Sequence, residues 1–116
     1  MSETMIESPV NVEEAVSRTG DREFLKELLE MFLEDAQDQL DRLRQAVEGA
    51  DAPGVVAASH SIKGAAANLA ASRVFASAKE IEEASRAGQA AELAGQVEDL
   101  GARIEELAAF TKSFEP

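Results

Sequence analysis

The 116-residue chain has no cysteine, tryptophan or tyrosine, only one histidine and only three prolines. The absence of cysteine excludes disulfides, thiolate metal sites and cysteine nucleophiles. Scarce aromatic residues, 4% of the chain, and abundant Ala, Leu and Glu favour helix over sheet. The segment from Met1 to Val10 has no basic residue and no apolar run of signal-peptide length, and no stretch reaches the roughly 20 apolar residues of a membrane span. We therefore expect a cytoplasmic protein with no membrane partner.

Basic residues are also scarce: 11 Lys and Arg stand against 23 Asp and Glu, for a formal net charge of -12. Such a surface repels a phosphate backbone, and the basic residues form no continuous run, so the sequence argues against nucleic-acid binding. Most of the acidity is explained as a solubilising surface.

Turn and capping signals predict five helices in one domain covering residues 1–116. The first begins near Asn11 and ends before Gly20, and the second runs from its cap at Asp21 to about Glu48. The third runs from Ala52 to about Ala70, after a cap at Asp51 and with Pro53 in its first turn. A fourth helix begins at a Ser72 cap and ends at Gly88, and a fifth carries the apolar residues from Leu93 to Leu107.

Apolar residues recur every three or four positions in the second, fourth and fifth of these segments, which gives each helix one apolar stripe. Short turns between such helices favour antiparallel neighbours. The predicted fold is therefore all-α: an antiparallel four-helix bundle with a short additional N-terminal helix. A bundle that closes its own core is most simply a monomer.

The single histidine, His60, lies in the middle of the third predicted helix. At about 100° per residue, Val55, Ile62 and Leu69 fall on one side of that helix, and His60 falls on the opposite side. The imidazole should therefore point to solvent. An exposed histidine is most often only a solvated surface residue, so its neighbours have to decide whether it has a function.

The neighbours of His60 on this face are small or basic. Gly64 follows one turn later and Ala67 two turns later, which leaves room for another molecule to approach the ring. Lys63 can pair with a phosphoryl group on the imidazole. From Ala52 through Lys79 the chain has three basic residues and no Asp or Glu. We therefore expect no negative charge near the imidazole, which suits a dianionic phosphoryl group.

The segment from His60 to Leu69, HSIKGAAANL, resembles the His-x-hydrophobic-Lys-Gly signature of histidine-containing phosphotransfer (HPt) domains. The segment from Ala78 to Ala84 is similar to the next helix of that family, and the resemblance covers nearly the whole chain. Ala70 is a departure, because many members have glycine there, so the third helix could run one or two residues further.

The resemblance implies a phosphocarrier that is not an ATP-dependent kinase. His60 would accept a phosphoryl group from a receiver-domain aspartate and pass it to a response-regulator aspartate, and Lys63 would stabilise charge. The resemblance further implies docking of receiver domains on the surface formed by these residues: Val56, Gly64, Ala67, Asn68 and Ala71. The chain itself would need no cofactor or metal, since Mg²⁺ in such exchanges belongs to the receiver.

Alternatives from other classes stay open. The same face could belong to a helical adaptor that binds a signalling partner without carrying phosphate. A carboxylate hydrolase is disfavoured because no acidic residue lies on a predicted apolar face, where desolvation would tune it. A carboxylate-type metalloprotein of the bundle class would need repeated Glu-x-x-His motifs, and one histidine cannot supply them. The start at Met1 favours a free-standing shuttle over a fragment of a hybrid kinase.

Overall fold

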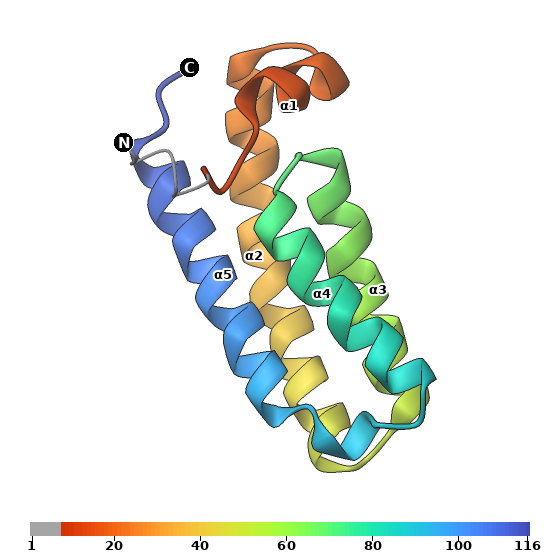
Figure 1. The fold of residues 1–116 in the computed structure, drawn as a ribbon. Helices are drawn as coiled ribbons and strands as arrows, with labels where there is room; N and C mark the ends of the chain where they lie inside the picture. The colour runs from red at the N-terminus through yellow and green to blue at the C-terminus, as the bar shows by residue number, and fades with distance from the viewer. Residues whose placement is uncertain (1–7) are drawn as a thin grey trace, which may run out of the picture.

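The computed structural model describes residues 8–116, and all of its regular elements are helices. The elements in chain order are α1 (Val12–Thr19), α2 (Arg22–Glu48), α3 (Ala52–Asn68), α4 (Ser72–Arg86), a 3-10 turn (Ala90–Glu92) and α5 (Ala94–Ser113). Helices α2 to α5 run side by side in an antiparallel bundle, and α1 lies across one end of it (Figure 1). The predicted fold class is confirmed.

Each of the first three helices begins at the predicted cap. The Asn11 side chain accepts from the backbone N–H of Glu14, Asp21 accepts from Phe24, and Asp51 accepts from Gly54. These bonds satisfy backbone donors that have no partner inside the first turn of a helix.

The predicted start of α4 was wrong by one residue. Ser72 is the first residue of the helix, and the cap position is occupied by Ala71, which has no side chain that could accept a hydrogen bond. The first turn of α4 therefore begins without a side-chain cap.

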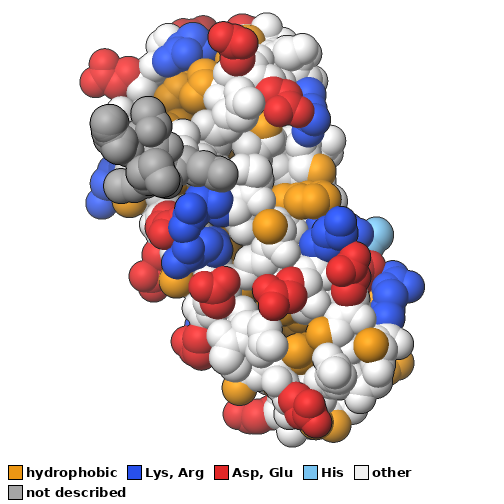
Figure 2. Space-filling view, viewed as in Figure 1, with side chains coloured by type: hydrophobic (Ala, Val, Ile, Leu, Met, Phe, Trp, Pro, Cys, Tyr) orange, Lys and Arg blue, Asp and Glu red, His pale blue; other side chains and the backbone are white. Residues whose placement is uncertain are grey.

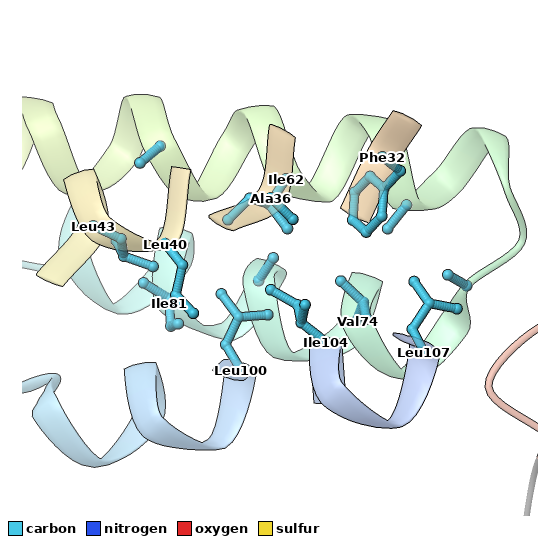
Figure 3. Packing of buried hydrophobic residues seen from close by; sticks show 14 of the residues in the cluster. Phe32, Ala36, Leu40, Leu43, Ile62, Val74, Ile81, Leu100, Ile104 and Leu107 are labelled. Atoms are coloured by element: carbon cyan, nitrogen blue, oxygen red, sulfur yellow. The ribbon is translucent and has the colours of Figure 1, made fainter. Parts of the chain in front are cut away.

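The core is a single apolar layer between the four long helices. Figure 3 shows its labelled side chains meeting along the bundle axis: Phe32, Ala36, Leu40 and Leu43 from α2, Ile62 from α3, Val74 and Ile81 from α4, and Leu100, Ile104 and Leu107 from α5. All of them are buried. The stripes predicted from periodicity are therefore the faces that the helices bury, and removal of this apolar area from water stabilises the bundle.

Helix α2 is longer than its neighbours, and its first turns extend beyond the end of α3. Helix α1 covers this end, where Ala15 and Leu25 are buried, and the N–H of Asn11 donates to the carbonyl of Ala70 at 3.1 Å. Lys26 of α2 also contacts the end of α5, where its Nζ donates to the carbonyls of Thr111 and Phe114. A cation at the C-terminal end of a helix is favourable there.

The end of α3 differs from the expectation. The helix ends at Asn68, not at Ala70 or beyond, and Ala70 takes a left-handed conformation with φ 51°. The N–H of Ala71 then donates to the carbonyl of Ala66, so the turn closes as a glycine would close it. Ala70 therefore adopts a left-handed backbone conformation that is unfavourable for a residue with a Cβ atom.

A second alanine, Ala50, has the same φ of 51° in the turn between α2 and α3 and is exposed. Left-handed backbone costs an L-residue about 1 to 2 kcal/mol, whereas glycine adopts it freely. We predict that Ala50→Gly raises the free energy of unfolding by about 0.5 to 1 kcal/mol in urea titrations followed by circular dichroism. The control is Ala76→Gly at an exposed position inside α4, which should lower the same quantity by about 1 kcal/mol. An equal change in the free energy of unfolding for Ala50→Gly and Ala76→Gly would contradict the expected benefit of glycine at a left-handed position.

Candidate functional site

Helix α3 presents His60 to solvent. Val55, Ala58 and Ile62 anchor the opposite side of the helix in the core, and the side chain of His60 is 63% exposed. In Figure 2 the histidine projects at the edge of the molecule beside basic side chains. The outward orientation predicted from helical geometry is confirmed.

The expectation of no negative charge near His60 was wrong. The carboxylate of Glu82 on α4 lies directly beside the ring, with Oε2 3.1 Å from Nδ1 of His60. The Glu82 side chain is only 4% exposed, so the carboxylate lies beneath the ring, in the seam between α3 and α4. One buried carboxylate behind an exposed ring leaves the solvent side of the imidazole open.

Two cations neutralise this carboxylate. Lys63 Nζ lies 2.8 Å from Oε1 of Glu82, and Arg86 Nη2 donates to Oε2 at 2.7 Å. With a neutral imidazole, Glu82, Lys63 and Arg86 together carry one net positive charge. The immediate surroundings of His60 therefore attract a phosphoryl dianion although they contain an acid.

The same contacts lower the pKa of Glu82 to about 2, from 4.5. The hydrogen bond from Lys63 contributes most, burial acts in the opposite direction, and Arg86 and His60 add to the lowering. Glu82 is therefore ionised at every pH at which a histidine can act as a nucleophile.

An ionised carboxylate can only accept hydrogen bonds, so Nδ1 of His60 must carry the hydrogen in this contact. In the neutral ring the lone pair is then on Nε2. Since Nδ1 is turned toward the buried carboxylate, Nε2 is the nitrogen left for reaction. The arrangement thus fixes both the tautomer and the orientation of an exposed imidazole.

The space beside the ring is open. A Cβ atom at Gly64 would meet no atom within 4 Å, so this glycine is not required for packing inside the protein. Val56 and Ala67 are half-buried, and Asn68 is exposed. None of these four residues is fully buried, so each could still contact a partner, and their role in docking stays a prediction.

Two of the predicted site residues differ from expectation. Ala71 is fully buried at the start of α4 and cannot form part of a docking surface. Lys63, which we expected to stabilise the phosphoryl group, is 25% exposed and lies 2.8 Å from a carboxylate oxygen of Glu82.

Sequence reasoning missed Glu82 and Arg86. The acid-free segment that we noted ends at Lys79, three residues before Glu82. A signal was present, because Glu82 lies four residues after the inward Ala78 and three before the inward Ser85. An acidic residue at the border of an apolar stripe indicates a buried carboxylate with a partner. The prediction that no acid lies on an apolar face was therefore wrong.

The described residues offer little for metal binding or membrane insertion. Within residues 8–116 no three His, Asp or Glu side chains gather as a metal-binding group. No helix in this same range is both long and apolar enough to cross a membrane.

The described residues thus form a small helical bundle that presents one imidazole to solvent beside a buried carboxylate. The Hpt domain family model matches residues 27–110. The chain therefore belongs to the Hpt domain family, and it is a histidine phosphotransfer intermediate of two-component phosphorelays.

The crystal structure of histidine-containing phosphotransfer protein B (HptB) from Pseudomonas aeruginosa PAO1 has the same fold. The TM-score is 0.82 at 23% sequence identity, and the match covers 92% of this chain and 94% of that one. Comparison with curated protein sequences finds no match.

The depressed pKa of Glu82 predicts how stability depends on pH. Because its folded pKa is about 2 and its ordinary value is 4.5, its ionised form stabilises the fold above pH 4.5, and this contribution is lost as the pH falls through 2. We expect Glu82→Gln to lower the free energy of unfolding at pH 7 by about 1 to 3 kcal/mol, with the difference from wild type shrinking toward pH 2. Urea titrations over this range measure it.

The matched control is Glu83→Gln, which removes an exposed carboxylate from the adjacent position of α4. It should change stability by less than about 1 kcal/mol at pH 7. A Glu82→Gln difference that stays constant from pH 7 to pH 2 would show that the buried carboxylate contributes through packing and not through charge.

Proposed function

We propose that His60 is the phosphoacceptor and that Nε2 is the nitrogen that carries the phosphoryl group. The observation that carries this proposal is the contact of Nδ1 with Glu82 at 3.1 Å, which leaves Nε2 with the lone pair on a ring that is 63% exposed. The alternative nitrogen is turned toward a buried carboxylate, where a phosphoryl dianion would be repelled.

The first transfer begins from an aspartyl phosphate on a receiver domain. Nε2 attacks phosphorus in line, the P–Nε2 bond forms, and the P–O bond breaks so that the aspartate leaves as a carboxylate. Nδ1 keeps its hydrogen, and the ring therefore becomes an imidazolium whose positive charge is stabilised by Glu82.

In the second transfer an aspartate of another receiver attacks the phosphorus, the P–Nε2 bond breaks, and neutral imidazole leaves. A cationic ring is a better leaving group than a neutral one, so the same carboxylate that orients the nucleophile also supports release. Mg²⁺ would be supplied by the receiver in both steps, and the phosphate would originate from a partner and not from ATP bound to this chain.

Exposed hydrophobic side chains on α2 and a groove between α2 and α3 are surfaces that a receiver could contact. Phe24 and Met31 of α2 are the large hydrophobic side chains that residues 8–116 leave exposed, at 46% and 64%. They lie two turns apart on one side of α2, and Arg42, three turns beyond Met31 on that side, lines a groove with Ser61 of α3. Of these features, the groove at Ser61 borders the residue next to His60, whereas Phe24 lies on the first turn of α2, which extends beyond the end of α3.

The decisive experiment is incubation with receivers of the source organism that have been phosphorylated beforehand. We expect acid-labile, base-stable phosphate on the wild-type protein and none on His60→Gln. Label on neither protein, with binding to the receiver retained, would favour the adaptor. Label that persists on His60→Gln would place the acceptor elsewhere.

A second prediction concerns access to the ring. Gly64→Glu adds bulk and negative charge one turn from His60, in a place where the protein itself has open space. We expect the fold to be retained and transfer to slow by at least about tenfold, since one like charge near a phosphoryl group costs about 1 kcal/mol or more. Gly64→Ala is the matched control and should be no less stable than wild type.

Circular dichroism and the rate of transfer from a phosphorylated receiver measure the two effects separately. Normal transfer by a well-folded Gly64→Glu protein would contradict an approach of the partner over this residue.

A further inference from the structure

Arg86 is the basic side chain of the site that the established family function does not explain. It lies one turn after Glu82 on α4, and its side chain is 60% exposed. Its Nη2 donates at 2.7 Å to Oε2 of Glu82, the same oxygen that lies 3.1 Å from Nδ1 of His60. Because they share one acceptor atom, the guanidinium and the imidazole are close neighbours at the protein surface.

Lys63 is placed differently. Its Nζ is bound to the other carboxylate oxygen, Oε1, at 2.8 Å, and its side chain is only 25% exposed. The Lys63 ammonium is held at a buried carboxylate and is largely covered, so it has less access than Arg86 to a phosphoryl group at the surface. Arg86 is the more accessible cation, because its side chain is 60% exposed and its guanidinium has five N–H donors, of which one is used in this contact.

We propose, on the basis of the proposed function, that Arg86 binds the phosphoryl group on His60 while Lys63 serves as the fixed counterion of Glu82. The guanidinium bridges Oε2 of Glu82 and a phosphoryl oxygen, with separate N–H groups donating to each. Arginine suits this role since its planar fork binds oxyanions with two donors at once. Although both side chains carry one positive charge, Arg86 thus binds the phosphoryl group and Lys63 neutralises Glu82.

The test uses the 116-residue protein labelled with phosphoramidate, so that no receiver has to be known. In labelling, the P–N bond of the reagent breaks, a P–Nε2 bond forms, and ammonia leaves. Phosphorus-31 NMR titration between about pH 6 and 9 then gives the proton affinity of the phosphoryl oxygens. Nitrogen-15 signals of the His60 ring, recorded on the same samples, separate protonation of the imidazole from protonation of the phosphoryl group.

A cation bound to the phosphoryl group disfavours its protonation. We therefore expect Arg86→Ala to raise the proton affinity of the phosphoryl oxygens by about three- to tenfold, and Arg86→Lys to raise it by less. The matched control is Arg73→Ala, which removes an arginine of α4 that pairs with Glu106 of α5. It should leave the titration unchanged.

A positioning role through Glu82 is separated by a double-mutant cycle. If Arg86 binds phosphate directly, Arg86→Ala raises the proton affinity in a Glu82→Gln background as well. An effect that vanishes in that background, or a labelled Arg86→Ala protein that titrates like wild type, would overturn the assignment of Arg86 alone. Failure of the wild type to take label on His60 would instead overturn the proposed function, and the assignment with it.

Discussion

The contact between Glu82 and His60 is the interaction on which the geometry of the candidate site depends. A buried carboxylate is costly unless it is paired, and here it is paired three times, with Lys63, Arg86 and the imidazole. In return it fixes the position of the hydrogen on an exposed ring that solvent alone would leave free to change tautomer and rotamer. An otherwise ordinary surface histidine thereby becomes an oriented imidazole, as the proposed role of nucleophile requires.

This arrangement also reconciles two electrostatic requirements that conflict at first sight. A phosphoryl dianion is repelled by carboxylates, yet a histidine that carries phosphate benefits from a carboxylate that stabilises its imidazolium form. The bundle meets both requirements because the carboxylate is buried while the cation and the open space are at the surface. Glu82 lies beneath the ring in the seam between α3 and α4, while Arg86 extends to the surface and Gly64 leaves the solvent side open.

Rigidity of the bundle makes such a site possible. Helices α3 and α4 are fixed against one another by the buried apolar residues that flank the site, Ile62 on α3 and Ala78 and Ile81 on α4. Because these side chains pack to a defined register, the carboxylate of Glu82 is held at hydrogen-bond distance from a ring 22 residues away in the sequence. The geometry of the candidate site is thus a consequence of core packing.

The sequence by itself determined the helices and the direction in which His60 points, because capping residues and a 3.6-residue period are local properties of the chain. Recognition of the segment from His60 to Leu69 added the family and its chemistry. The sequence did not predict the register between neighbouring helices, because no local pattern specifies it. For that reason Glu82 and Arg86 were missed, the contact of Lys63 with Glu82 was not foreseen, and Ala71 was placed on the surface although it is buried. Periodicity decides which face of a helix is buried, but only the packing of α3 against α4 decided which side chains meet there.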